Sequence, residues 1–296
     1  MKGKLLTHIG LGRFFALPCA VCAVLLGCAL GGSLSWISAV VALAVVFQMA
    51  YSHSFNTLLD YSWTGFDKGA QEERSRGKIY TKGQQVIAAG EMSPREVLLN
   101  GLGYLAISAV FTGIVAWQVS PVIWAFWAVG TLTTFWYSWG KLHYQCELAL
   151  GMGFGPIACM MGMATQPNPD FMIAFLAGIP FLILWGFAAE FVDQAIDAEP
   201  NYPRGLRNLG ALAWKSGVSI PLFTGHLFIM AYVAQILLIV VGVLAPMTGL
   251  SLIAFPFIVY GLLIMGNDFN RTGIMLLLLA CFVHMVAFTA GQIVGG

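Results

Sequence analysis

Two clusters of acidic residues give the sequence its clearest chemical signal. The first comprises Asn56, Asp60 and Asp67, and the second comprises Glu190, Asp193 and Asp197. At about 100° per residue, each cluster falls on one helix face, provided in the first case that the helix continues through Gly65. Clustered carboxylates repel one another unless a cation neutralises them, and Mg²⁺ is commonly bound by one or two carboxylates together with substrate phosphates. The pattern predicts Mg²⁺ ions that bridge a diphosphate, with Asp60, Asp67, Asp193 and Asp197 as the metal ligands and catalytic residues.

The chain that carries these clusters is too apolar to be a water-soluble protein. Hydrophobic residues make up 59% of its 296 residues and charged residues only 9%, whereas a soluble domain carries about 25% charged residues. We therefore expect the lipid bilayer to be the solvent for most of the chain. The sequence has no basic patch, which excludes nucleic acid as a partner.

Nine apolar runs approach the length of about 20 residues that a membrane-spanning helix needs. Helices are expected because an open sheet cannot satisfy its backbone in lipid and the runs lack the alternation of a barrel. The sequence thus predicts an all-α integral membrane protein, a single domain over residues 1–296 with nine transmembrane helices in one bundle. The predicted spans are Phe14–Gly32, Trp36–Leu58, Val97–Gln118, Val122–Ser138, Leu148–Thr165, Phe171–Glu190, Ile220–Leu244, Leu250–Met265 and Gly273–Gln292.

The charged residues divide unevenly between the two sides of this bundle. With nine spans, all 14 lysine and arginine residues fall in the N-terminal segment or in the loops 59–96, 139–147, 191–217 and 266–272, which share one side. The positive-inside rule makes that side cytoplasmic, so we expect a multi-pass protein of the inner (plasma) membrane with a cytoplasmic N-terminus. Of the 13 acidic residues, only Asp170 lies opposite. The two longest cytoplasmic loops, between spans two and three and between spans six and seven, are expected to cap the site.

Three stretches resemble, in their order along the chain, the motifs of a known family, although Asp60 and Asp67 are one residue further apart than in its first motif. Residues 56–67 resemble N-x-x-x-D-x-x-x-G-x-D, and residues 87–96 resemble I-x-S-G-x-I-S-P-x-E. The second stretch also predicts a helix start on physical grounds, because Ser93 is an N-cap and Glu96 completes a capping box. Residues 193–207 resemble a second aspartate motif with a basic tail. By these motifs the chain resembles the UbiA superfamily of intramembrane prenyltransferases, and its first motif is closest to the branch that prenylates 1,4-dihydroxy-2-naphthoate.

The resemblance implies an enzyme that transfers a prenyl chain from a prenyl diphosphate to a lipophilic acceptor with Mg²⁺ as cofactor. It implies an aromatic acceptor, and the naphthoate-like motif favours a quinone precursor such as 1,4-dihydroxy-2-naphthoate in menaquinone biosynthesis. Basic side chains are expected to contact the diphosphate, and aromatic side chains are expected to stabilise the allylic cation. The expected substrate-binding residues are Asn56, Lys68, Tyr137, Lys141, Tyr144, Arg204 and Arg207.

Other functions remain open at this stage. Within the enzyme class, the acceptor can instead be a tetrapyrrole or a glycerol-phosphate lipid. A membrane transporter that uses the acidic clusters for ion coupling is the main alternative from another class, since intramembrane acids also mark ion pathways. The acids here lie at helix ends and on one side, whereas transporter sites lie near the membrane midplane. A purely structural membrane protein would leave the paired spacing of the aspartates unexplained.

Overall fold

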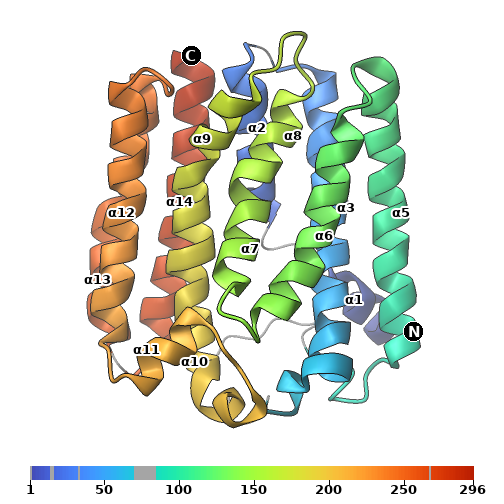
Figure 1. The fold of residues 1–296 in the computed structure, drawn as a ribbon, viewed down its shortest axis with the longest axis vertical. Helices are drawn as coiled ribbons and strands as arrows, with labels where there is room; N and C mark the ends of the chain where they lie inside the picture. The colour runs from blue at the N-terminus through green and yellow to red at the C-terminus, as the bar shows by residue number, and fades with distance from the viewer. Residues whose placement is uncertain (1, 14–16, 33, 70–84, 267) are drawn as a thin grey trace.

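The structure is a computed structural model that describes residues 2–13, 17–32, 34–69, 85–266 and 268–296. The chain is helical throughout these ranges, without any strand, and most helices run side by side along one axis (Figure 1). The α-helices are α1 (Lys2–Leu11), α2 (Leu17–Leu30), α3 (Trp36–Leu59), α5 (Pro94–Gln118), α6 (Ile123–Gly140), α7 (Cys146–Met152), α8 (Ala158–Met163), α9 (Phe171–Phe181), α10 (Glu190–Asn201), α11 (Leu209–Lys215), α12 (Ile220–Val240), α13 (Phe255–Met265) and α14 (Arg271–Gly295).

Seven helical stretches in the described part of the chain are long and apolar enough to cross a membrane. They are Trp36–Thr64, Pro94–Gln118, Cys146–Met163, Phe171–Arg204, Ile220–Val240, Pro246–Met265 and Arg271–Gly295. The two other predicted spans coincide with α2, which is shorter, and with α6, which is rich in threonine and tryptophan. The described residues confirm the prediction of an all-helical fold and provide seven candidate membrane spans, while the count of nine spans stays a prediction.

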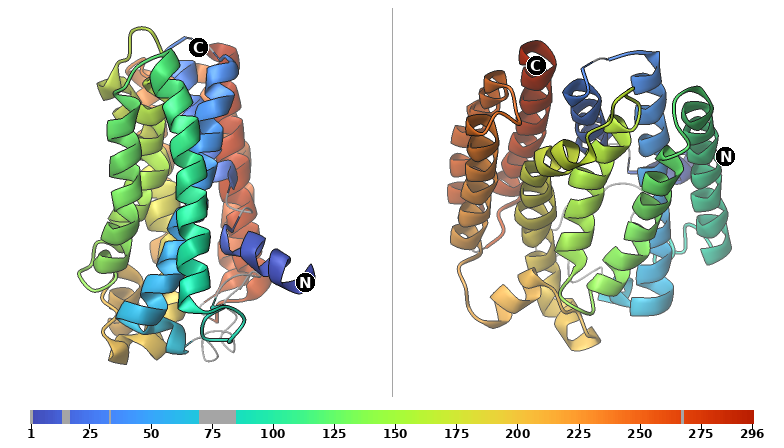
Figure 2. Two further views of the ribbon diagram at one scale, coloured as in Figure 1. Left: turned by 90° about the vertical axis from the view of Figure 1, so that its right-hand side faces the viewer. Right: turned by 45° about the horizontal axis from the view of Figure 1, so that its top comes forward.

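One helix was not expected from the sequence. The N-terminal residues form α1, which lies across the bundle axis rather than along it (Figure 2). It packs against α3 and α5, and the backbone carbonyl of His8 accepts a hydrogen bond of 3.0 Å from the Tyr104 hydroxyl. The basic N-terminal segment is too short and too polar for the sequence to predict a membrane span there. Its helix is recognised only in the structure, where it packs against α5.

The two acidic clusters lie on different kinds of helix end. Helix α3 gives way at Asp60 to a single π-helical turn that ends at Gly65, whose φ of 72° lies in the left-handed region that glycine adopts readily. A short 3₁₀ helix, Phe66–Gly69, follows. The helix therefore does not continue through Gly65, and the condition for placing Asn56, Asp60 and Asp67 on one helix face is not met. The second cluster does lie on a continuous helix, α10.

The predicted start of the third span is confirmed. Ser93 is the N-cap of α5, and its hydroxyl accepts the Glu96 N–H at 3.2 Å. The Glu96 carboxylate in turn accepts the Ser93 N–H at 2.8 Å, which completes the capping box. Pro94 occupies the first turn, where its missing N–H costs nothing.

Two π-helical segments interrupt the helices that face the centre of the bundle. Residues Gly153–Ile157 join α7 to α8, and residues Leu182–Ala189 join α9 to α10. Prolines lie within or just before these segments, at Pro156 and Pro180. A proline lacks an N–H and disturbs the helical hydrogen-bond ladder, and π-helical turns often mark functional sites. Both segments contribute residues to the larger of the two cavities described below.

Helices α2 and α8 are in backbone contact through two glycines. A Cβ added at Gly162 would lie 2.0 Å from the Val24 carbonyl oxygen, and one added at Gly27 would lie 1.9 Å from the Cys159 carbonyl oxygen. Small residues allow such close approach between membrane helices, where packing rather than hydrophobic transfer drives association. This contact fixes the first predicted span against the fifth.

We predict that Gly162→Ala destabilises the protein, because the new methyl group has no space between α8 and α2. Overpacking of this kind costs about 1–3 kcal/mol of unfolding free energy. Thermal unfolding in detergent should show a lower Tm for this variant. The matched control is Gly103→Ala in α5, since a Cβ at Gly103 meets nothing within 4 Å. Equal Tm values for the two variants would contradict the packing described here.

Candidate active site

The four aspartates predicted to bind metal line one small polar cavity at the end of the bundle. Asp60 and Asp67 come from the end of α3 and the 3₁₀ helix after it, while Asp193 and Asp197 come from α10. The two pairs are more than 120 positions apart in the chain, and the fold nevertheless brings all four aspartates to the same cavity of about 50 Å³. Asn56, Tyr137 and Lys141 also line it.

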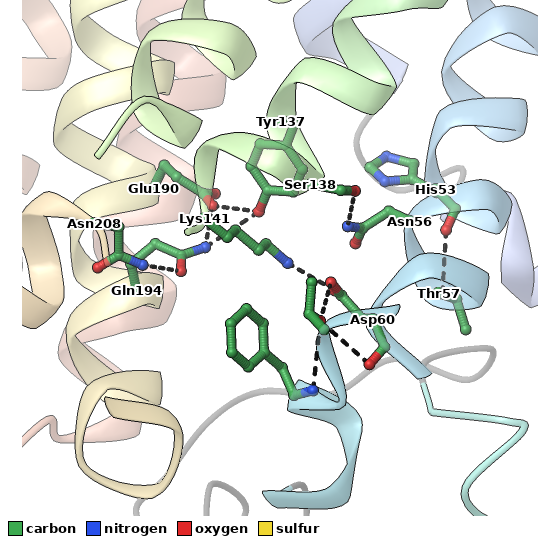
Figure 3. A network of polar contacts seen from close by, with 12 residues as sticks. His53, Asn56, Thr57, Asp60, Tyr137, Ser138, Lys141, Glu190, Gln194 and Asn208 are labelled. Atoms are coloured by element: carbon green, nitrogen blue, oxygen red, sulfur yellow. Dashed lines mark hydrogen bonds and ion pairs between the residues drawn. The ribbon is translucent and has the colours of Figure 1, made fainter. Parts of the chain in front are cut away.

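A buried ion pair connects the first cluster to helix α6. The Lys141 Nζ lies 2.6 Å from Asp60 Oδ2, and both residues are less than 10% exposed. The ammonium group also lies 4.7 Å from the centroid of the Tyr137 ring. Burying two charges is costly, so a close and well-surrounded contact is needed to compensate. Lys141 is therefore held at the cavity beside the carboxylate it neutralises (Figure 3).

A second polar network connects α6 to α10. The Tyr137 hydroxyl donates to Glu190 Oε1 at 2.5 Å, and the Gln194 amide donates to the same carboxylate oxygen (Figure 3). Asn208 then donates to Gln194 Oε1 at 2.5 Å and caps α11 by accepting the Ala211 N–H. Each buried polar group in this chain of contacts has a partner, which fixes the orientation of Tyr137 and Glu190.

Backbone hydrogen bonds join the loop after α6 to the loop after α10. The Lys141 carbonyl accepts the Arg207 N–H at 2.6 Å, and the Tyr144 N–H donates to the Arg207 carbonyl at 2.8 Å. The buried carboxylate of Glu147 accepts the N–H of Leu209, the first residue of α11, at 2.7 Å. The loop after α6 and the loop after α10 thus form one layer at this end of the bundle.

A larger cavity adjoins the polar one and extends into the bundle. It has a volume of about 230 Å³ and shares Arg13, Asn56, Tyr137 and Asp193 with the smaller cavity. Most of its lining is apolar, and the polar residues that line this cavity alone are Gln48, Ser52, His53, Thr133, Thr134 and Glu190. The apolar lining includes Val45, Met49, Leu150, Phe154, Ile157, Met161, Trp185 and Leu278.

Some residues predicted to bind substrate lie elsewhere. Tyr144 is 47% exposed. Arg204 is exposed, and its guanidinium donates to the Pro200 carbonyl. Arg207 stacks on the Tyr202 ring at 4.4 Å and donates to the Tyr202 carbonyl. None of these three lines either cavity. The side chain of Lys68 lies outside the described part of the chain.

Four polar residues at the smaller cavity were not predicted as site residues from the sequence: Arg13, Gln85, Gln194 and Asn201. Gln85 adopts a positive φ of 58°. From the sequence, Arg13 was interpreted only as one of the basic residues before the first span. Nothing in the local sequence indicates that its side chain lines a cavity. The spacing of Gln194 four residues after Glu190 was a signal for Gln194, since i and i+4 lie on the same helix face.

The donors at the smaller cavity fit Mg²⁺. Carboxylate and amide oxygens line it, with no histidine or cysteine among the described residues there, which matches a hard cation rather than zinc. In the part of the chain that the structure describes, no three His, Cys, Asp or Glu side chains are grouped tightly enough to bind a metal alone. Mg²⁺ does not require such a group, because it keeps waters and takes phosphate oxygens as ligands.

Solved structures with a similar fold cover almost the whole chain. A digeranylgeranylglyceryl phosphate synthase matches with a TM-score of 0.63 and 16% identity over 99% of both chains. A UbiA homologue from Archaeoglobus fulgidus bound to DMAPP and Mg²⁺ matches with a TM-score of 0.61 and 16% identity, over 97% of this chain and 99% of the other. A UbiA homologue from Archaeoglobus fulgidus bound to GPP and Mg²⁺ matches with a TM-score of 0.62 and 15% identity, over 97% of this chain and 99% of the other. These likenesses show the fold.

The sequence itself gives the family. No curated protein sequence matches the chain. The model of the UbiA prenyltransferase family, in contrast, matches residues 15–273, which include both aspartate pairs and all residues that line the two cavities except Arg13 and Leu278. The match covers far more than half of the 296 residues. The chain therefore belongs to the UbiA prenyltransferase family and is a prenyltransferase.

Proposed function

We propose that this enzyme transfers a prenyl chain from a prenyl diphosphate to a lipophilic aromatic acceptor, with Mg²⁺ held by Asp60, Asp67, Asp193 and Asp197. One observation carries the proposal: these four carboxylates line a single polar cavity that shares residues with a larger, mostly apolar one. The polar cavity suits a diphosphate with its metal ions, and the apolar one suits a prenyl chain. The related structures described with a prenyl diphosphate and Mg²⁺ support this assignment.

The residues of the polar cavity act on the leaving diphosphate. Bound Mg²⁺ supplies positive charge that stabilises the diphosphate as its bond to the prenyl carbon breaks. Lys141 provides a further positive charge, since its ammonium is already held at the cavity by Asp60. Asn56, whose amide donates to the Ser138 hydroxyl at 3.4 Å, is placed to orient Asp60 or a water. The electron pair of the broken bond leaves with the diphosphate.

The larger cavity protects the reactive prenyl group. Its apolar wall excludes water, which would otherwise capture an allylic cation. Tyr137, Phe154 and Trp185 line the cavity and present aromatic rings, and aromatic faces stabilise a nearby cation. The acceptor supplies an electron pair to the prenyl carbon and releases a proton.

We propose a quinone precursor such as 1,4-dihydroxy-2-naphthoate as the acceptor, because the first aspartate motif resembles the naphthoate branch. A glycerol-phosphate lipid is the second candidate for the acceptor, because the chain shares its fold with a digeranylgeranylglyceryl phosphate synthase. The purified enzyme should be incubated with Mg²⁺, a panel of prenyl diphosphates and both classes of acceptor. Mass spectrometry of the products then identifies the acceptor class.

We predict that Asp60→Asn and Asp193→Asn each lower Mg²⁺-dependent release of diphosphate by at least about 100-fold, because each removes charge that stabilises the transition state. The control is Asp170→Asn. Asp170 caps α9 by accepting two N–H groups at 3.0 Å, a role that asparagine also fills. Asp193→Asn and Asp170→Asn should unfold at similar temperatures, whereas Asp60→Asn should unfold at a lower temperature because it leaves the buried Lys141 ammonium without its carboxylate. Full turnover by either cavity variant would rule out the metal assignment.

We predict that Lys141→Gln lowers both stability and turnover, since it leaves Asp60 buried without its cation. Removing one partner of a buried ion pair costs about 3–5 kcal/mol. The double variant Asp60→Asn with Lys141→Gln should regain much of the lost Tm but none of the activity. Lys215→Gln is the control, because Lys215 is exposed. If the double variant is as unstable as Lys141→Gln alone, the two residues are not a coupled pair.

We propose that the acidic end of the bundle faces the cytoplasm and that the enzyme lies in the inner membrane. A reporter fused near Asp170 should then be external, and a reporter fused near Gln71 should be cytoplasmic, since the basic loops are retained inside. Cysteine accessibility or reporter-enzyme activity in intact cells provides the measurement. The opposite labelling pattern would reverse the orientation without changing the site.

A further inference from the structure

Four neutral polar side chains line the larger cavity in the interior of the bundle. They are Gln48 and Ser52 from α3 and Thr133 and Thr134 from α6, and we call them the oxygen stripe. Gln48 lies near the middle of α3 and is only 7% exposed. Polar side chains inside a membrane span are unfavourable and often mark a functional site, so the hydrogen bonds of the stripe need to be accounted for.

The orientation of the Gln48 carboxamide follows from its contacts with α6. Its Nε2 donates to the Trp127 carbonyl at 2.6 Å and to the Thr131 hydroxyl at 2.9 Å. The carbonyl can only accept, and Thr131 already donates its hydroxyl hydrogen to that carbonyl at 2.9 Å, so the amide nitrogen must face both. Both hydrogens of Nε2 are therefore used, and Gln48 Oε1 accepts no hydrogen bond from the described residues.

The hydroxyl hydrogens of the stripe are also used within the protein. Ser52 donates to the Gln48 carbonyl at 3.1 Å, and its Oγ lies 2.7 Å from Thr134 Oγ1. Only donation by Thr134 satisfies both contacts, because Ser52 has a single hydroxyl hydrogen. Thr133 donates to the Gly130 carbonyl at 2.6 Å. The four side chains thus have oxygen lone pairs to spare and no spare hydrogen.

A second buried glutamine shows that joining helices does not require an open amide oxygen. Gln235 of α12 donates to the Thr248 carbonyl at 2.8 Å, and its Oε1 accepts from the Ser251 hydroxyl at 3.1 Å. Gln235 lines neither of the two cavities. Gln48 donates across a helix interface in the same way, yet its oxygen has no partner among the described residues. Helix packing alone therefore does not explain Gln48.

The stripe begins near the end of the cavity that the aspartates share. Along α3, Ser52 precedes Asn56 by one turn and Gln48 precedes it by two, which is about 6 Å and about 12 Å along the axis. Asn56 lines both cavities. A Cβ added at Gly130 would lie only 3.2 Å from Gln48 Oε1, so the glycine leaves this oxygen uncovered. A substrate that extends from the shared end along α3 meets these oxygens.

We propose that Gln48, Ser52 and Thr134 accept hydrogen bonds from hydroxyl groups of the acceptor substrate, so that the enzyme selects hydroxylated substrates. This inference rests on the proposed prenyl transfer and adds the substrate class of the larger cavity. A hydroxyl hydrogen pairs with the open lone pairs, whereas a carbonyl oxygen in its place is repelled by them. A site built to bind a hydroxyl rejects the analogue that lacks it, because buried polar groups are then left without partners.

The test compares substrates that differ at their hydroxyl groups. Binding to the purified protein is measured for 1,4-dihydroxy-2-naphthoate kept reduced, for its oxidised quinone and for 2-naphthoate. A second set compares a prenylated glycerol phosphate with the same molecule in which hydrogen replaces the free hydroxyl. We expect the wild type to bind the hydroxylated member of one set at least about 10-fold more tightly, the range for a hydrogen bond left unmade. The set that shows the preference identifies an aromatic diol or a glycerol lipid.

Variants then assign the preference to the stripe. Gln48→Met and Thr134→Val remove lone pairs at similar side-chain size, so each should lose most of the preference and keep the affinity for the analogue without hydroxyls. Thr134→Ser keeps the oxygen and should keep the preference. The matched control is Gln235→Met, which breaks similar hydrogen bonds away from both cavities and should bind with the wild-type preference.

Three results would overturn the inference. They are a wild type without preference in either set, a preference that survives both Gln48→Met and Thr134→Val, and an equal loss of preference in Gln235→Met. Diphosphate release is measured in parallel with Mg²⁺ and each prenyl diphosphate. A protein that prefers hydroxylated compounds but releases no diphosphate from any donor would refute prenyl transfer and leave the hydroxyl site standing.

Discussion

Bringing several carboxylates together at one end of an apolar bundle is the constraint on which the rest of this structure depends. Negative charges repel strongly where the dielectric is low, and the two pairs of aspartates come from helix ends that are distant in the chain. Lys141 offsets part of this repulsion through its buried contact with Asp60. The charge that Lys141 leaves unbalanced is the reason that we propose Mg²⁺ as the further counter-ion of these carboxylates.

The surrounding polar network keeps that site in one arrangement. Helix α6 contributes both Lys141 and Tyr137, which contact α3 and α10 respectively. The carboxylate of Glu147 then ties α7 to the first turn of α11. A change in the position of any one of these helices would break several buried hydrogen bonds at once. The aspartates therefore sit on a rigid support, which is what positioning for catalysis requires.

Features that depend on local sequence could be predicted, and features that depend on distant contacts could not. The capping box at Ser93 and the spacing of Asp193 and Asp197 on α10 follow from helical geometry alone. The break at Gly65 follows from the backbone freedom of glycine, which already made a helix that continues through this residue doubtful. Arg13 became a cavity residue only through folding. Arg207 looked like a phosphate ligand, yet its guanidinium is used to hold Tyr202.

The contact between α2 and α8 has a consequence for how lipid-dissolved substrates reach the interior. Both helices line the larger cavity, α2 with Ala20 and α8 with Ala158 and Met161. Carbonyl oxygens of each helix lie where the other has only hydrogen on its glycines, so no hydrocarbon chain can thread between the two. A prenyl chain long enough to extend beyond the cavity must therefore pass through another gap between the helices. The contact at Gly27 and Gly162 thus excludes the α2–α8 interface as a path by which a lipid-dissolved substrate enters the cavity.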